Sequence, residues 1–481
     1  MDADDVGAVA SRVHRLAILG QAAPGYVTRS PVSVAVVGKT SMYQEALARP
    51  RSADSQSSTL PLRVVRIIDR LNIGGPSKHV VWLSAGLNTA AFDTVLITGT
   101  LPEGEGDMSY FARAAGVTPV VIAEMGREIG LRDVVVIAKL VLQLLKLKPD
   151  IIHTHKAKAG AVGRVAAMIY KWATPSILRF RPRQCAIVHT YHGHIFHGYY
   201  GRVRTRLFIA IERGLARICT DRIIVLSKQQ LGEISGRYGI GRTEQFRVVP
   251  LGIDLEEVKG SSNFLRKELG ISDDQTAIGI VGRLCEVKNH RMFLEAAARI
   301  VRDPSVRTRL IVVGDGHLRK ELEEQSKRLG LSDCVTFTGF REDAAPLCRA
   351  LDIVALTSLN EGTPLTLIEA MWCARAVVAT DVGGVRDLMG ARRETIDGVT
   401  VWDHGVTVPS CNVEAFARAL RFLIEHAELR KELGERGRAF VATRMSKERL
   451  LGDFEQMYNE LAGLGRQEEP SSERQPLAQH H

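Results

Sequence analysis

The stretch Ile278-Gly279-Ile280-Val281-Gly282-Arg283-Leu284 decides the fold class of this chain. It is a short apolar run that ends in a glycine turn, which is typical of a strand buried on both faces of a parallel sheet. Four similar runs follow it, at Leu310–Val313, Val335–Thr338, Ile353–Leu356 and Val377–Thr380. Helical patterns separate the runs, so this half of the chain is predicted to be a doubly wound α/β domain.

A similar series of apolar runs precedes this one. Its candidate strands are Val64–Ile68, Thr94–Thr98, Pro119–Ile122, Ile151–His153, Ala186–Thr190 and Arg222–Leu226. Two successive arrays of similar size predict two Rossmann-like domains, with a boundary near Pro250–Asn263. Ligands of such sheets bind beyond the carboxyl ends of the strands, so the residues that follow each strand are the candidates for function.

The sequence divides into five parts on this basis. We expect an N-terminal extension, partly disordered, at 1–60, the first domain at 61–252, the second at 253–445, a C-terminal helix at 446–464 and a disordered tail at 465–481. The extension contains Gly38-Lys39-Thr40, which resembles the end of a phosphate-binding loop. The first glycine of that motif is replaced by Ser33, so the motif is rejected.

Composition restricts the class of protein. The seven cysteines form no CxxC pair, which favours a reducing compartment over a disulfide framework. The acidic start does not resemble a secretory signal. The apolar stretch Val134–Leu147 is interrupted by Lys139 and Lys146 and is shorter than the ~20 residues of a spanning helix. These features predict a soluble or peripheral protein.

Charged residues stand at the strand ends of the second domain. Gly282 and Arg283 are followed by Lys288, and a guanidinium beside an ammonium suits a diphosphate. Farther on, Glu361 precedes a predicted helix and Glu369 lies within it. Two carboxylates can bind two sets of hydroxyl groups, and the helix N-terminus between them suits a phosphate.

The first domain offers a glycine turn, Gly74-Gly75, and two histidine clusters, His153–Lys158 and His189–His194. Histidines at a strand end can bind a polar substrate by hydrogen bonds, bind zinc or serve the fold alone. Zinc is the weakest of these, because no carboxylate or thiol stands at the usual spacing. No metal and no cofactor are therefore predicted.

Together these motifs resemble family 4 of the retaining glycosyltransferases, which have the two-domain GT-B fold. The resemblance rests on the Gly74-Gly75 loop, Gly282-Arg283-Leu284 with Lys288, and Glu361-x7-Glu369, and it runs from about Leu62 to Leu461. The segments Asp150–Lys156, Lys158-Ala-Gly, Gly163-Arg164 and His189–His194 are similar to a bacterial branch that assembles polysaccharides, including exopolysaccharides.

The resemblance implies a role for each matching residue. Arg283 and Lys288 would hold the donor diphosphate, Glu361 the sugar hydroxyls, and Glu369 the ribose. His192 would lie at the sugar, and it joins Arg283, Lys288 and Glu361 as a catalytic candidate. The other donor-binding candidates are Gly75, Gly282, Phe340, Arg341, Gly362, Leu365 and Thr366, and the acceptor-side candidates are His155, Lys156, Lys158 and His194.

The implied reaction is a metal-independent sugar transfer. The donor would be a nucleoside-diphosphate sugar, with UDP favoured, and the acceptor a lipid-linked sugar or a polysaccharide. A sugar-nucleotide epimerase shares the two-domain architecture and remains the first alternative. A nucleic-acid-binding protein is suggested by the net charge of +10, but no recognised binding motif accompanies it, so no nucleic acid is expected.

Positive charge is concentrated between Lys156 and Arg247, where 17 Lys and Arg face 4 Asp and Glu. Within this sector a predicted helix, 201–218, has a basic edge beside an apolar stripe that runs from Val203 to Ile218. A core helix with a solvated face would explain the stripe. The charge favours an anionic membrane surface instead, so we expect a cytoplasmic protein peripheral to the inner face of the cell membrane. The contact residues would be Arg202, Arg206, Arg213 and Arg217.

Overall fold

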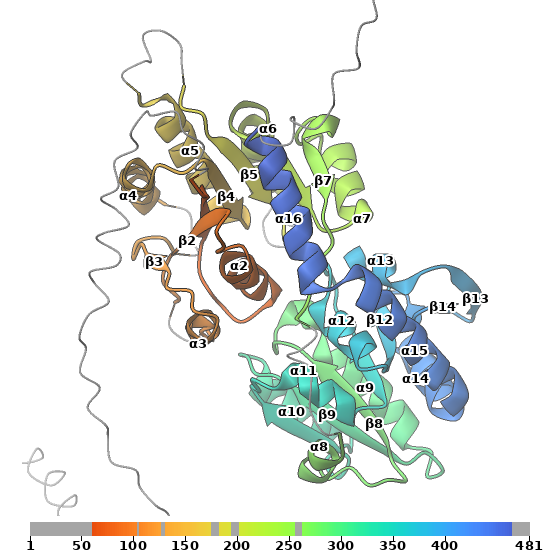
Figure 1. Cartoon of the computed structure of the whole chain (residues 1–481). Helices are drawn as coiled ribbons and strands as arrows, with labels where there is room; N and C mark the ends of the chain where they lie inside the picture. Colours follow the sequence, from red (N-terminus) through yellow and green to blue (C-terminus); the bar gives the residue numbers. More distant parts are fainter. Residues whose placement is uncertain are drawn as a thin grey trace, which may run out of the picture. The chain divides into compact units, whose positions relative to one another are not determined.

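The computed structural model describes residues 60–102, 105–126, 130–174, 182–193, 202–254 and 262–463, without the side chains of residues 202, 204 and 262. The predictions for the N-terminal extension and for the tail therefore lie outside the described residues, apart from residue 60. Two sheets organise the described chain, each flanked by helices (Figure 1). The prediction of two doubly wound α/β domains is confirmed.

The first sheet is parallel throughout and has the strand order β3-β2-β1-β4-β5-β6-β7. Its strands are β1 (Leu62–Ile68), β2 (Phe92–Thr98), β3 (Val120–Val121), β4 (Ile151–His155), β5 (Ala186–Thr190), β6 (Arg222–Val225) and β7 (Phe246–Val248). Its helices are α2 (Gly75–Gly86), α3 (Ser109–Ala114), α4 (Arg132–Leu147), α5 (Ala157–Trp172), α6 (Arg202–Cys219) and α7 (Lys228–Leu231). The strand order reverses between β1 and β4, so a ligand is expected at their carboxyl ends.

The second sheet has the order β10-β9-β8-β11-β12-β15-β14-β13 and reverses between β8 and β11. Its strands are β8 (Thr276–Val281), β9 (Thr308–Val313), β10 (Val335–Gly339), β11 (Ile353–Leu356), β12 (Ala376–Thr380), β13 (Arg392–Ile396), β14 (Val399–Trp402) and β15 (Val406–Val408). Its helices are α8 (Ser262–Glu268), α9 (His290–Val301), α10 (Arg319–Arg328), α11 (Ala344–Leu347), α12 (Leu365–Trp372), α13 (Arg386–Met389), α14 (Val413–Glu425) and α15 (Ala427–Arg444). The antiparallel edge formed by β13, β14 and β15 was not expected from the sequence.

The last helix, α16 (Lys447–Leu461), leaves the second domain and packs on the first sheet (Figure 1). Ser446 caps it by accepting a hydrogen bond from the Arg449 N–H. Its apolar stripe, which includes Leu450 and Phe454, lies against Val64 of β1 and other residues of the first sheet. The C-terminal helix is therefore part of the core of the first domain.

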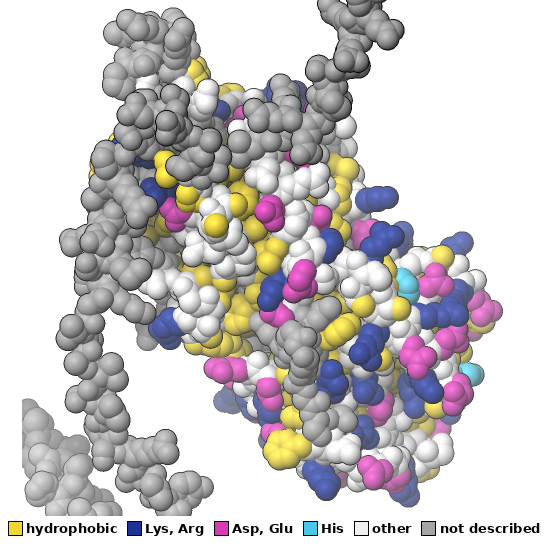
Figure 2. Space-filling view, in the orientation of Figure 1, with side chains coloured by type: hydrophobic (Ala, Val, Ile, Leu, Met, Phe, Trp, Pro, Cys, Tyr) yellow, Lys and Arg dark blue, Asp and Glu magenta, His cyan; other side chains and the backbone are white. Residues whose placement is uncertain are grey.

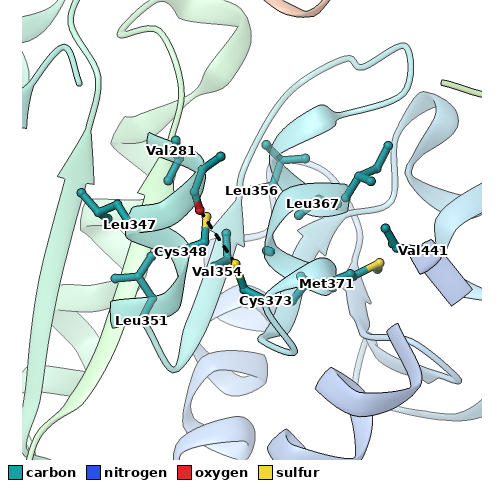
Figure 3. Close-up of a cluster of buried hydrophobic side chains, with 14 of the residues drawn as sticks. Val281, Leu347, Cys348, Leu351, Val354, Leu356, Leu367, Met371, Cys373 and Val441 are labelled. Atoms are coloured by element: carbon teal, nitrogen blue, oxygen red, sulfur yellow. Dashed lines mark hydrogen bonds between the residues drawn. The ribbon is translucent and has the colours of Figure 1, made fainter. Parts of the chain in front are cut away.

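The apolar core of the second domain packs against α12. Leu367 and Met371 of this helix are fully buried, with Val354 and Leu356 of β11 and Val441 of α15 in the same apolar cluster (Figure 3). Burying a leucine or methionine side chain contributes about 1.5–3 kcal/mol. Such packing fixes the position of α12, and with it the direction of the helix N-terminus and of Glu369.

Acidic and basic side chains are interspersed on the face of the second domain that Figure 2 shows. Several of them form ion pairs, such as Arg421 with Glu425 and Arg436 with Glu432. Among the described residues, no helix has both the length and the apolar character that crossing a bilayer would need.

Candidate active site

Most of the predicted catalytic residues lie near the points where the strand order of the two sheets reverses. In the first sheet, Gly74-Gly75 follows β1 and His155 ends β4. In the second, Gly282 follows β8, and Glu361 follows β11 by a short loop. The sequence could indicate these positions because each residue stands directly after an apolar run.

Three histidines meet at the edge of the first sheet. His155 Nδ1 lies 3.0 Å from His192 Nε2, a hydrogen bond between the ends of neighbouring strands. His79, from the first turn of α2, lies edge-on to His192 with 5.0 Å between ring centroids. His79 was missed from the sequence, although its place one turn after the Gly74-Gly75 loop directs it to the same strand ends. His194 lies outside the described residues.

These imidazoles are kept neutral by burial. Desolvation holds the pKa values of His155 and His192 well below the ordinary 6.5, and neighbouring histidines lower them further. Desolvation, with the charges of Arg66 and Arg449, lowers the pKa of His79 to about 3. A neutral imidazole both donates and accepts hydrogen bonds, so His192 suits a sugar hydroxyl better than it suits a phosphate.

A buried polar layer lies beneath this trio. His153 contacts the Tyr458 hydroxyl from Nδ1 and the Thr190 hydroxyl from Nε2, both at 2.7 Å. Arg66 of β1 is fully buried and donates to the same Tyr458 hydroxyl at 3.4 Å. Because Tyr458 belongs to α16, the C-terminal helix contributes directly to the support of the site.

The two predicted acceptor-side lysines differ in their surroundings. Lys156 Nζ lies 3.1 Å from an Asp69 carboxylate oxygen and donates to Asn72 Oδ1 at 2.8 Å. Lys156 is half-buried and follows directly after β4, so it lies at the carboxyl ends of the strands. Lys158 is instead buried against Asp133 of α4, at 2.5 Å, within the helical layer. The geometry thus brings Lys156, and not Lys158, to the edge where a ligand would bind.

In the second domain, Lys288 and Glu361 are paired. Lys288 Nζ lies 2.5 Å from Glu361 Oε1, and the Ser358 hydroxyl donates to the same oxygen at 2.6 Å. Lys288 ends a short 3₁₀ turn, and Asn289 then takes a left-handed conformation with φ 47°. The pair joins the loop after β8 to the loop after β11, so the proposed diphosphate and sugar residues lie side by side.

Positive charge is also available around this pair. Arg283 is exposed, and its side chain forms no hydrogen bond or ion pair with any described residue. The N-terminus of α12 has no side-chain cap at Pro364, and the Thr366 hydroxyl donates to the Val281 carbonyl at 3.3 Å. Uncapped N–H groups with the positive end of the helix dipole form an anion-binding position.

Close approaches join the two domains at the predicted residues. Lys78 Nζ donates to Glu369 Oε1 at 3.1 Å, between α2 and α12. A Cβ on Gly75 would lie 3.0 Å from Leu365, and one on Gly362 would lie 2.7 Å from the His192 carbonyl oxygen. Glycine is therefore needed at 362 for backbone to approach backbone. The structure thus brings His192, at the strand ends of the first sheet, against the loop that precedes α12.

The candidates for binding the base lie at the end of β10. Phe340 is exposed, as a ring available for stacking would be. The Arg341 guanidinium contacts Glu268 and lies 2.6 Å from Asp343, and these carboxylates raise its pKa. The pairing fixes the arginine beside Phe340.

The membrane candidates lie on α6. Arg206, Arg213 and Arg217 are exposed, and the side chain of Arg202 is outside the description. The apolar stripe faces solvent except at Leu215, which is 9% exposed: Val203 is 80% exposed, Leu207 59% and Ile218 75%. The buried face holds Glu212 in an ion pair with Arg164 at 2.7 Å, beside Leu215, Ala216 and Cys219. A core role therefore does not explain the stripe.

Comparison with known proteins agrees with this geometry. Residues 73–257 match the family model described as Glycosyltransferase Family 4, and residues 261–440 match Glycosyl transferases group 1. A D-inositol 3-phosphate glycosyltransferase of Saccharomonospora viridis is 30% identical over 65% of this chain and 70% of its own length. The UDP-Gal:alpha-D-GlcNAc-diphosphoundecaprenol alpha-1,3-galactosyltransferase of Escherichia coli is 28% identical over 59% of this chain and 74% of its own.

Solved structures show the same fold. Anabaena Alr3699/HepE in complex with UDP-glucose superposes with a TM-score of 0.66 at 21% identity, over 83% of this chain and all of the other. WaaG, a glycosyltransferase involved in lipopolysaccharide biosynthesis, superposes with a TM-score of 0.59 at 18% identity, with the same coverage. The chain therefore belongs to glycosyltransferase family 4 and is a glycosyltransferase with the two-domain GT-B fold.

Proposed function

We propose that this glycosyltransferase moves a sugar from a UDP-sugar to a lipid-linked or polysaccharide acceptor during cell-surface glycan assembly, with retention of configuration. The observation that carries the proposal is the approach of His192 to Gly362, beside the Lys288–Glu361 pair. The UDP-sugar and the diphosphoundecaprenol-linked sugar in the name of the Escherichia coli relative support this donor and acceptor class.

The roles follow from the chemistry at each position. Arg283, Lys288 and the α12 N-terminus receive the diphosphate and stabilise the negative charge that develops on the leaving UDP. Glu361, held in place by its ion pair with Lys288, accepts hydrogen bonds from the sugar hydroxyls, and Glu369 accepts them from the ribose. Neutral His192 contacts the sugar from the acceptor side.

Transfer proceeds without a metal ion in this proposal. Arg283, Lys288 and the helix dipole supply the positive charge that a divalent cation supplies at other diphosphate sites. The exposed ring of Phe340, beside Arg341, stacks on the uracil, and the half-buried Lys156 contacts the acceptor, with the fully buried His155 behind it. Activity should therefore survive an excess of chelator.

The first test is a thermal-shift screen of the full chain with UDP, GDP, ADP and their sugars. A ligand that binds the native state at a hundredfold excess over its Kd adds roughly 2.7 kcal/mol of stability, so UDP and UDP-sugars should raise Tm more than the others do. Transfer to a polyprenyl-diphosphate sugar then tests the reaction. Conversion of the donor to an epimer without any acceptor would identify an epimerase instead.

A further inference from the structure

The His79, His155 and His192 side chains converge from α2, the end of β4 and the segment after β5. Each offers one ring nitrogen, and the three nitrogens lie within 4.8 Å of one another. Nitrogens on one tetrahedral zinc ion are about 3.3 Å apart, because each Zn–N bond is about 2.0–2.1 Å long. His155 Nδ1 and His192 Nε2 are already 3.0 Å apart. To bind the same ion, the His79 ring would therefore have to move more than the other two rings.

Several of these nitrogens have no hydrogen-bond partner among the described residues. His79 is 1% exposed, and neither of its nitrogens is bonded. His155 is fully buried, and its Nε2 is likewise unbonded. A buried polar atom without a partner costs about 1–3 kcal/mol, so binding an electron-pair acceptor through a His79 nitrogen offsets part of that cost.

We propose that His79, His155 and His192 form a site for a divalent transition-metal ion such as Zn²⁺, and that the ion inhibits sugar transfer. Three imidazoles without a carboxylate favour zinc, copper or nickel over magnesium, calcium or manganese. The inhibition rests on the function proposed above, because it follows from the engagement of His192, the donor-sugar contact. The binding of the ion does not depend on that function.

The surroundings set how tightly the ion is held. The buried guanidinium of Arg66 has no carboxylate partner among the described residues, and its charge opposes a second cation nearby. Only three protein ligands are present in the group, which leaves a fourth position for water. Binding is therefore weaker than at a closed four-ligand structural site, and a chelator should reverse it. Such a site is compatible with transfer that needs no metal.

The first experiment measures binding without reference to activity. Co²⁺ is added to the chelator-treated full chain, and visible absorption is recorded, because tetrahedral Co²⁺ absorbs far more strongly than octahedral Co²⁺. A tetrahedral spectrum that Zn²⁺ displaces is expected for the wild type, and it should be lost in His79→Gln. A spectrum absent from the wild type, or unchanged in a folded His79→Gln, would overturn the site. The wild-type result decides the matter even if the variant does not fold.

The second experiment measures inhibition. Zn²⁺ should raise the apparent KM for the donor in the wild type, chelator should restore it, and the KM and rate of His79→Gln should be the same with Zn²⁺ as with chelator. His317→Gln is the matched control, because His317 Nε2 lies 3.0 Å from both Glu286 carboxylate oxygens and is an exposed place where zinc could bind. Zinc sensitivity that persists in His79→Gln, or that disappears in His317→Gln, would contradict the proposal.

The two experiments separate the proposals. Cobalt binding without zinc inhibition would overturn the inhibitory role and leave the proposed transfer intact. An absence of transfer with every donor would refute the proposed function, while the cobalt spectrum would still decide on the metal site.

Discussion

Lys78 and Glu369 form an ion pair between the two domains, with Lys78 Nζ 3.1 Å from Glu369 Oε1. Lys78 comes from the helix after the Gly74-Gly75 loop, and Glu369 is the carboxylate proposed to bind the ribose. The Glu369 side chain is 9% exposed, and its ion pair with Lys78 fixes the position of the carboxylate. The residue proposed to bind the ribose is thus oriented by the opposite domain.

Replacing Lys78 should weaken donor binding more than it slows turnover. Lys78→Met removes the partner that orients Glu369, and a partly exposed pair of this kind contributes up to about 1 kcal/mol, or roughly a fivefold change in Kd. Calorimetry with UDP measures the effect. Lys139→Met is the control, because Lys139 pairs with Glu124 on the surface of the first domain. Equal affinities in both variants would show that the pair has no part in donor binding.

Removing Arg283 should slow transfer without unfolding the protein. Its side chain is exposed and unpaired among the described residues, so Arg283→Ala should leave Tm nearly unchanged. Loss of one charge-stabilising group at the leaving diphosphate costs about a hundredfold in kcat. Arg291→Ala, which breaks a surface pair with Glu321, is the control. Normal turnover by the Arg283 variant would refute the diphosphate assignment.

The two carboxylates should respond differently to neutralisation. Glu361→Gln should reduce transfer by at least about tenfold and leave UDP affinity little changed, since the proposed partner of Glu361 is the sugar. Glu369→Gln should weaken UDP binding itself, because its partner is the ribose. Steady-state kinetics and UDP titration of both variants measure this. The reverse pattern would mean that the two roles are exchanged.

Much of this arrangement was predictable because parallel strands buried on both faces form continuous apolar runs. The positions of Arg283, Lys288 and Glu361 followed from their places after such runs. His79 and Tyr458 did not, because their contacts depend on how α2 and α16 cross the first sheet. The spacing of residues within one segment of the sequence does not show how two helices far apart in the chain cross the sheet.

The case of α6 shows another limit of the sequence. The spacing of its apolar residues predicts an amphipathic helix. Which face of the helix packs against the domain depends, however, on residues elsewhere in the chain. Arg164 of α5 and the Tyr191 hydroxyl both bind Glu212, and this draws an acidic residue into the interior. The apolar stripe, apart from the buried Leu215, is consequently turned outward, which no pattern within residues 201–218 could indicate.

The buried histidines should make stability fall in mild acid. The pKa of His79 is lowered to about 3, so below pH 6.5 the unfolded chain binds a proton that the folded chain does not. Its contribution to the free energy of unfolding is complete above pH 6.5 and declines by about 1.4 kcal/mol per pH unit down to pH 3. Denaturation of His79→Gln between pH 7 and 4 should show a shallower decline. His426→Gln, at an exposed site, should retain the wild-type slope.

The outward stripe of α6 should bind an anionic bilayer. α4, α5 and α6 pack side by side, and apolar residues are also exposed at the start of α4, where its N-cap Leu131 is 93% and Val134 69% exposed. Each nearby lysine or arginine adds about 1 kcal/mol of attraction to an anionic surface, and the apolar side chains can enter the interface. The full chain should therefore sediment with anionic liposomes at low salt and much less with neutral ones.

Charge reversal tests which residues make this contact. Arg202→Glu, Arg206→Glu and Arg217→Glu combined should abolish sedimentation, whereas Arg213 is left in place because it donates to the Tyr238 carbonyl. The control reverses the same number of charges on α10 of the other domain, at the exposed Lys320, Lys327 and Arg328. Replacing Val203 and Leu207 by serine should weaken the binding that remains at higher salt, because apolar insertion is not screened. If the α10 variant loses as much sedimentation as the α6 variant, the attraction depends on net charge and not on α6. Equal sedimentation of the wild type with neutral and anionic vesicles would refute the electrostatic contact.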